Sequence, residues 1–348
     1  MTVSLPSEWT KQNNINPGDI VFVIPEKDST LKIVPSQLLQ KEEAEEYIIN
    51  ADVCNEPRIL ERIIIGSYIL GRDVIRVVSS RRIRKEHVDE VRGIIRKLIG
   101  LGILEETPKS ILLQCAIDPA KFKFDLLFRR LSLIASTILS EAMQALAERN
   151  NSLAGEAINR EDEADTIYYL AVRLLLSAQM NPDIAEKTGM EEVLGRRAIP
   201  ATRLMLQNLE SIADHSEGIA KKVIMLEDYR DRLSADFVRK ICHLGELTQT
   251  IFDKAVDCVF TKDIKISNGL LEMRKAFETE SEELMRELPE IPYLRAIVST
   301  LSDITDKAAT FAHLAMNMAL EEPSEYLENI VRARKHVRTL PLPSKKKT

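Results

Sequence analysis

Two pairs of acidic residues share the same spacing in neighbouring segments of the chain. Glu161 and Asp165 are four residues apart, and so are Glu210 and Asp214. On a helix this spacing places both carboxylates of a pair on one face, one turn apart. If the two helices pack together, four carboxylates meet and repel one another unless a cation compensates their charge. All-oxygen ligands suit hard ions such as Mg²⁺, Mn²⁺ or iron.

The alternative interpretation of these pairs is a solvated acidic face, to which we assign the adjacent Asp162 and Glu163. Charge pairs on such a face contribute only about 0.2–0.5 kcal/mol each. His215 follows Asp214 directly and therefore projects about 100° round the helix from it, so we expect a surface or packing role. No histidine has a glutamate three residues before it. The Glu-x-x-His motif of di-iron bundle oxidases is therefore absent, which argues against redox catalysis.

From residue 122 onward the chain has the periodicity of amphipathic helices. Around Glu210 and Asp214, apolar side chains recur at alternating spacings of four and three, as on one buried seam of a helix. The seam consists of Met205, Leu209, Ile212, Ser216, Ile219 and Val223. The expected helices are 122–150, 153–180, a third that bends at Pro200 and ends near 229, then 234–262, 267–288 and 292–320.

Three helices followed by three more form an internal repeat with a period of roughly 110 residues. This predicts a six-helix bundle of two related halves, at about 122–230 and 234–320. The helical domain is expected to span 122–335, and the basic, Pro-containing tail 336–348 is expected to be disordered.

The N-terminal part reads as two smaller units. Residues 47–118 alternate strand and helix in the order β-α-β-α-β, with one helix over 85–100, which predicts a small α/β or α+β domain. No Gly-rich phosphate loop follows any of these strands, so nucleotide binding is not predicted. Residues 1–38 read as short strands and turns, and the charged stretch 40–46 as a linker or short helix. The expected fold is mainly α, with an α+β N-terminal part.

The composition narrows the class of protein. The formal net charge is −6, so no global basic field attracts nucleic acid or an anionic membrane. The four cysteines have no Cys-x-x-Cys spacing and are expected as free thiols in a reducing compartment. No apolar run approaches the roughly 20 residues of a membrane span, and the first residues do not read as a secretory leader. We therefore predict a cytoplasmic protein without a membrane span.

The repeated three-helix unit resembles the PhoU family of phosphate uptake regulators. The strings AINRE (157–161) and LESIAD (209–214) match the family's second-helix and third-helix motifs, and LSDITD (301–306) keeps the third-helix frame in the second half. The resemblance covers over 200 residues. It implies a metal site at Glu161, Asp165, Glu210 and Asp214, with iron, zinc, magnesium or manganese as the ion.

The same resemblance implies a second, weaker metal site in the second half. Its residues are Glu278, Glu282 and Asp306. Ser302 stands where the family has a glutamate, which removes one charged ligand. Asp303 or water is expected to assist.

The first 38 residues resemble the SpoVT/AbrB swapped-hairpin domain, and the combination with a PhoU-like bundle is similar to archaeal PhoU-related proteins. The resemblance rests on Val3–Pro6, Trp9, the turn Asn16–Asp19 and Leu31–Pro35. The family has a strand before this segment, so the unit is either truncated at its start or incomplete. The segment contains three lysines and four acidic residues, which favours dimerisation over contact with DNA.

Together these resemblances imply a non-enzymatic, metal-binding regulator of phosphate homeostasis. It would act as a homodimer through a protein partner, such as a phosphate-transporter ATPase or a sensor protein. The alternative is an AbrB-type DNA-binding transcriptional regulator whose helical domain senses a metal. A third interpretation is a metal-dependent hydrolase that uses the carboxylate site.

Overall fold

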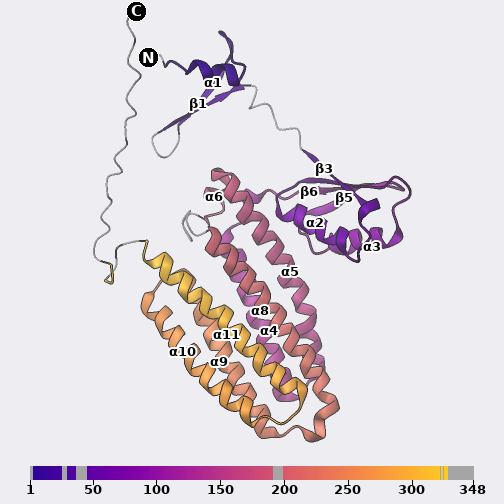
Figure 1. Cartoon of the computed structure of the whole chain (residues 1–348), viewed down its shortest axis with the longest axis vertical. Coiled ribbons are helices and arrows are strands. Elements are labelled where there is room, and N and C mark those ends of the chain that lie inside the picture. Colours follow the sequence, from indigo (N-terminus) through magenta and orange to yellow (C-terminus); the bar gives the residue numbers. More distant parts are fainter. Residues whose placement is uncertain are drawn as a thin grey trace, which may run out of the picture. The chain divides into compact units, whose positions relative to one another are not determined.

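The computed structural model describes residues 3–25, 30–36, 45–190, 199–321, 323 and 325–327. The chain divides into two compact units. One contains Met1–Arg96 and Gly100–Ile117, and the other contains Lys97–Ile99 and Asp118–Thr348. The fold is mainly helical with a small α+β N-terminal part, as the sequence predicts (Figure 1). Within the described ranges, no helix is both long enough and apolar enough to cross a membrane.

The first N-terminal element is a short helix followed by a hairpin. Helix α1 is Ser7–Gln12, and strands β1 (Val21–Pro25) and β2 (Leu31–Pro35) pair antiparallel with Val21 opposite Pro35. The expected turn at 16–19 is present: Gly18 has φ +102°, and the Asn16 backbone N–H donates to Asp19 Oδ2 at 2.7 Å. Glycine adopts a positive φ without steric cost, so the residues of the turn are sufficient to form it.

A four-stranded sheet follows, in the order β3-β4-β6-β5. Strand β3 pairs parallel with β4, while β6 pairs antiparallel with both β4 and β5. Helices α2 (Ile59–Ile69) and α3 (Lys85–Ile94) cover one face (Figure 1). The core between them contains Ile64, Ile75, Val77, Val91 and Leu113. The strands are β3 Glu46–Asn50, β4 Val74–Val78, β5 Leu101–Thr107 and β6 Ser110–Cys115.

This sheet contains one more strand than we predicted from the sequence. The expected helix over 85–100 ends at Ile94, and the order becomes β-α-β-α-β-β because 101–107 forms strand β5. Gly100, with φ +78°, turns the chain into that strand. Strand β5 forms its hydrogen bonds with β6 across a tight turn. This pairing involves a second segment, so the side-chain pattern of 101–107 alone does not indicate it.

The second unit is built on six long helices in its described part. Within each half the three helices pack on one another, and the halves meet through α4 against α9 and α8 against α11. Figure 1 shows these helices running alongside one another. They are α4 Phe124–Glu148, α5 Asn151–Met180, α8 Ile199–Met225, α9 Ala235–Thr261, α10 Ile264–Glu287 and α11 Pro292–Ala319. A short helix, α6 (Pro182–Lys187), follows α5.

Pro200 lies in the first described turn of helix α8, Ile199–Met225. A proline is tolerated in the first turn of a helix. The segment that would precede a bend at Pro200 is outside the described residues. Residues 191–198, the expected tail 336–348 and most of the linker 40–46 lie outside the described residues.

The same two-residue turn joins the first two helices of each half. Arg149, which follows the last residue of α4, has φ +55°, and the Asn150 side chain then accepts from the Ser152 and Leu153 N–H groups that start α5. In the second half, Lys262 has φ +51°, and the Asp263 side chain caps α10 in the same way. A left-handed residue followed by an Asx cap is a local signal for ending one helix and beginning the next.

An aromatic cluster joins the two halves. The Phe128 ring of α4 lies edge-on to Phe260 of α9 at 5.7 Å and 6.3 Å from Phe311 of α11, measured between ring centroids. Phe128 is 1% exposed. The contact between halves is therefore apolar at this point.

We expect Phe128→Ala to lower the free energy of unfolding by about 3–5 kcal/mol, because it leaves a cavity between the halves. Urea denaturation followed by circular dichroism measures the change. Leu126→Ala, on the exposed side of the same helix, is the control and should change stability by less than about 0.5 kcal/mol. Equal losses in the two variants would contradict this account of the core.

Candidate metal centre

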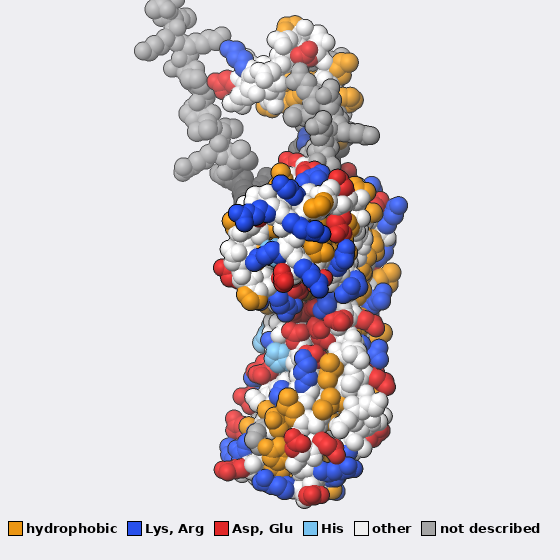
Figure 2. All heavy atoms as spheres, turned by 90° about the vertical axis from the view of Figure 1, so that its right-hand side faces the viewer, with side chains coloured by type: hydrophobic (Ala, Val, Ile, Leu, Met, Phe, Trp, Pro, Cys, Tyr) orange, Lys and Arg blue, Asp and Glu red, His pale blue; other side chains and the backbone are white. Residues whose placement is uncertain are grey.

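The first predicted site lies on two packed helices. Glu161 and Asp165 project from α5, and Glu210 and Asp214 project from α8. The side chain of Asp165 is 13% exposed, Glu161 and Glu210 are partly buried, and Asp214 is exposed. Figure 2 looks at the α5 side of the helical unit and shows acidic side chains gathered on it. The apolar seam of α8 packs inward, so the acidic pair is left beside α5.

The shifted pKa values indicate that carboxyl groups on the two helices interact electrostatically. Burial and then the Asp165 charge raise the pKa of Glu161 to about 7. Burial followed by the charges of Asp214 and Asp165 raises the pKa of Glu210 to about 7. Burial and the Asp165 charge also raise the pKa of Asp214. The charge of Asp165 thus acts on carboxyl groups of both helices. Among the described residues, a group of three or more acidic ligand atoms within 4.8 Å of one another is found on α5 alone, and Glu210 and Asp214 lie outside that group.

The tightest group includes a residue that the sequence reading assigned to the solvated face. Glu161, Asp162 and Asp165 each offer a carboxylate oxygen, and these atoms all lie within 4.8 Å of one another. Asp162 is exposed and stands three residues before Asp165. The i,i+3 spacing, which also brings side chains together on a helix, is the signal that could have identified it.

Lys97 was not anticipated at this site. Its Nζ lies 2.6 Å from Asp162 Oδ1 and 3.0 Å from Asp165 Oδ2, and it belongs to the short segment that groups with the helical unit. Burial by itself would lower the pKa of Lys97, but the hydrogen bonds that its ammonium donates to Asp162 and Asp165 outweigh this and raise the pKa. One ammonium group neutralises part of the cluster only, because Glu161, Glu210 and Asp214 retain raised pKa values.

A hydrogen-bonded chain orients Glu210. The Tyr168 hydroxyl lies 2.7 Å from Gln207 Oε1, and Gln207 Nε2 donates to Glu210 Oε2 at 2.7 Å. Such outer contacts fix the direction of a ligating carboxylate. The donor set is thus half-buried, rich in oxygen and short of positive charge, which fits a hard cation.

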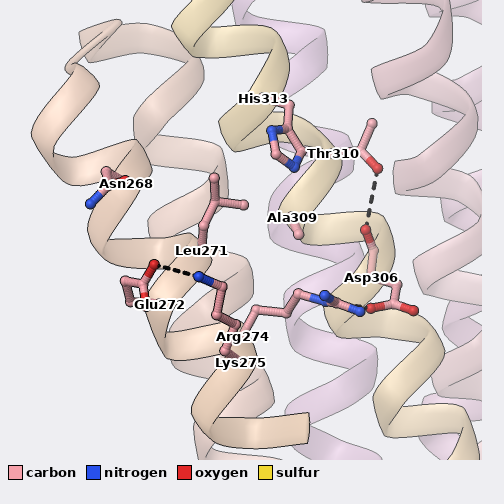
Figure 3. Close-up of a pocket in the computed structure, with 9 residues that line it drawn as sticks. All are labelled: Asn268, Leu271, Glu272, Arg274, Lys275, Asp306, Ala309, Thr310 and His313. Atoms are coloured by element: carbon pink, nitrogen blue, oxygen red, sulfur yellow. Dashed lines mark hydrogen bonds and ion pairs between the residues drawn. The ribbon is translucent and has the colours of Figure 1, made fainter.

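The second predicted set has different partners. Arg274 of α10 donates through Nε to Asp306 Oδ1 at 2.7 Å, and its Nη1 lies 3.5 Å from Glu278 Oε2. Glu282 instead pairs with Arg286 at 3.3 Å. Figure 3 shows Arg274 extending from α10 toward Asp306 on α11. The structure brings Glu278 and Asp306 together around an arginine, which the sequence reading did not include.

His215 does not join the donor set described above. Its Nε2 lies 4.0 Å from Asp303 Oδ2 of α11, so the ring faces the second half. Asp303, the expected helper of the second site, is therefore near a histidine of α8.

The fold and this site define a class: helical bundles built from three-helix halves with clustered carboxylates on packed helices. Residues 128–223, which span α4 to α8 and hold the four carboxylates, match the PhoU domain family model. The chain is also 28% identical over 190 residues to the phosphate-specific transport system accessory protein PhoU homolog of Borreliella burgdorferi. That alignment covers 51% of this chain and 82% of the relative.

Two solved structures are also similar. PhoU from Pseudomonas aeruginosa is 18% identical with a TM-score of 0.46, covering 57% of this chain and 96% of that one. The phosphate transport system regulatory protein PhoU from Streptococcus pneumoniae is 18% identical with a TM-score of 0.45, covering 57% and 94%. The first half of the helical unit is thus PhoU-like in sequence, in agreement with the motifs quoted above.

The raised pKa values predict that the metal-free protein loses stability as the pH rises. Glu161 and Glu210 have pKa values of about 7 in the folded state, against an ordinary value of 4.5. Between these pH values the folded state holds protons that the unfolded state releases, so the free energy of unfolding falls. We expect Glu161→Gln/Glu210→Gln to match the wild type near pH 4.5 and to exceed it at pH 7.5 by about 2 kcal/mol, after screening.

Urea denaturation with a chelator present, from pH 4.5 to 7.5, measures this difference. Glu156→Gln/Glu163→Gln, which removes two exposed carboxylates of the same helix, is the control and should follow the wild type. A Glu161→Gln/Glu210→Gln curve parallel to the wild-type curve at every pH would show that the cluster is not electrostatically strained.

Proposed function

We propose that this protein is a non-enzymatic regulator of phosphate uptake that acts through a protein partner. The observation that carries the proposal is the PhoU-domain match over residues 128–223, the same helices that carry the carboxylate cluster. The similar protein of Borreliella burgdorferi is described as an accessory protein of phosphate-specific transport. The partner is a phosphate-transporter ATPase or a sensor protein, and the place of action is the cytoplasm.

A metal ion at the α5–α8 cluster is part of this proposal. Glu161, Asp165, Glu210 and Asp214 would hold it, with Asp162 at the edge. The raised pKa values support the site because they report negative charge in need of compensation. The ion, whether iron, zinc, magnesium or manganese, would supply positive charge that stabilises the bundle and shapes the surface a partner meets. The residues themselves position oxygens and exclude part of the solvent.

The N-terminal hairpin supports a homodimer. Phe22, Val23 and Leu31 on β1 and β2 are 46%, 54% and 60% exposed. A lone two-stranded hairpin is marginal in water and gains stability when its apolar side chains are covered. We propose that this SpoVT/AbrB-like segment pairs with the same segment of a second chain. Contact with DNA is disfavoured, because residues 1–38 contain more acidic residues than lysines.

Phosphate uptake in cells tests the regulatory function. In a strain of the source organism that lacks the gene, uptake of labelled phosphate in phosphate-rich medium should be faster than in the wild-type strain. The wild-type gene should restore control, and the Glu161→Gln/Glu210→Gln gene, expressed to the same level, should not. Unchanged uptake in the deletion strain would contradict the proposed function.

Metal affinity tests the site separately. Lys97 occupies two of the carboxylates, so a cation must displace it from Asp165. We expect Lys97→Met to bind Mn²⁺ about tenfold more tightly than the wild type, a gain of about 1.4 kcal/mol. Glu210→Gln/Asp214→Asn should lose binding. Isothermal titration calorimetry of chelator-treated protein measures both.

Lys254→Met, at an exposed lysine of α9, is the control and should leave Mn²⁺ affinity unchanged. In a parallel melting experiment, a chelator should lower the melting temperature of the wild type but not of Glu210→Gln/Asp214→Asn. Equal shifts in the two proteins would place the ion elsewhere.

A further inference from the structure

The two halves of the bundle carry acidic groups at corresponding places but compensate them differently. Counted from the corresponding caps, Asn150 of α5 and Asp263 of α10, Arg274 stands where Glu161 stands in the first half, and Glu278 stands where Asp165 stands. The second half thus has a cationic side chain at a position where the first half has a carboxylate. Arg274 is long enough to cross to α11 and bind Asp306.

Arg274 makes the contacts that an ion would otherwise make. Its guanidinium binds Asp306 of α11 through Nε at 2.7 Å and approaches Glu278 of α10 at 3.5 Å, so it bridges the two helices. Asp306 hydrogen bonding then raises the pKa of Arg274, which stays charged at every physiological pH. An incoming ion cannot remove this competitor by deprotonating it.

The remaining ligands of the second group are weak. Ser302, which stands where Glu210 stands in the first half, donates its hydroxyl to the Val298 carbonyl of its own helix at 3.3 Å. Glu282 is paired with Arg286. An ion would therefore find two carboxylates, both of them bound to Arg274.

The acidic group of the second half is accessible to solvent, so access does not explain why it would bind no ion. Arg274 and Asp306 line an open surface cavity of about 510 Å³ between α10 and α11, together with His313 and Thr310 (Figure 3). Glu278 and Asp306 are 53% and 56% exposed. Ions can reach the carboxylates, so the bound guanidinium is the obstacle.

We propose that Arg274 is a built-in cation that replaces a metal ion in the second half, so that the bundle binds metal in its first half only. This inference rests on the proposed metal centre for its comparison of the halves. The second half then holds α10 to α11 without an ion, and only the α5–α8 pair responds to metal supply. In this view, Glu278 and Asp306 of the expected second site form an ion-pair group with Arg274, while Glu282 pairs with Arg286.

The test measures Mn²⁺ binding by titration calorimetry on the full chain in which Glu161→Gln/Glu210→Gln removes the first site. The protein with these two substitutions, the background variant, should show no stoichiometric Mn²⁺ binding. Adding Arg274→Gln should open the second group and produce one bound ion per chain, with an affinity at least about tenfold above the background. Adding Arg286→Gln instead, which frees Glu282 alone, should produce none.

Two results would overturn the proposal. One is stoichiometric Mn²⁺ binding by the background that Asp306→Asn removes, since Arg274 would then not close the site. The other is a folded Arg274→Gln triple variant, verified by its melting curve in chelator, that gains no ion.

A second measurement does not depend on the Arg274 variant folding. Asp306→Asn in the otherwise wild-type chain should leave the number and affinity of bound Mn²⁺ ions unchanged, and a decrease would refute the proposal. If the wild type binds no ion while the triple variant gains one, the first metal centre fails and the role of Arg274 stands.

Discussion

Repulsion between half-buried carboxylates is the constraint on which the functional part of this structure depends. Apolar packing of α5 against α8, with Ile167, Leu209 and Ile212 in the core, keeps the two helices that carry the acidic side chains next to each other. Burial and mutual charge raise the pKa values of Glu161 and Glu210. Bound positive charge would relieve this repulsion, which is the physical basis of the metal centre that we propose.

The two halves have the same arrangement of three helices but neutralise their acidic side chains differently. The same left-handed residue and Asx cap join their first two helices, at Arg149 and Lys262. In the first half the neutralising groups come from outside the two helices, partly from Lys97 and, as we propose, from an ion. In the second half Arg274 is covalently part of α10. In our proposal, dependence on a free cation is thereby confined to one half.

The N-terminal part raises a different physical problem, because its hairpin has too little structure to bury its own apolar residues. The four-stranded sheet has helices α2 and α3 over one face and a core of its own. The β1–β2 hairpin leaves Phe22, Val23 and Leu31 exposed. In the proposed function, the hairpin accordingly serves dimerisation and the bundle serves regulation, so that each role follows from the surface that the corresponding part leaves uncovered.

The sequence by itself determined the features that depend on nearby residues. Apolar periodicity marks the long helices, and the four-residue spacing places each acidic pair on one helix face, because both follow from 3.6 residues per turn. Tertiary structure alone decided which charges meet. Lys97 reaches Asp165 across 68 positions, Arg274 reaches Asp306 across 32, and β5 exists because β6 pairs with it. Long side chains and strand pairing act between segments, so their partners depend on packing that no local pattern encodes.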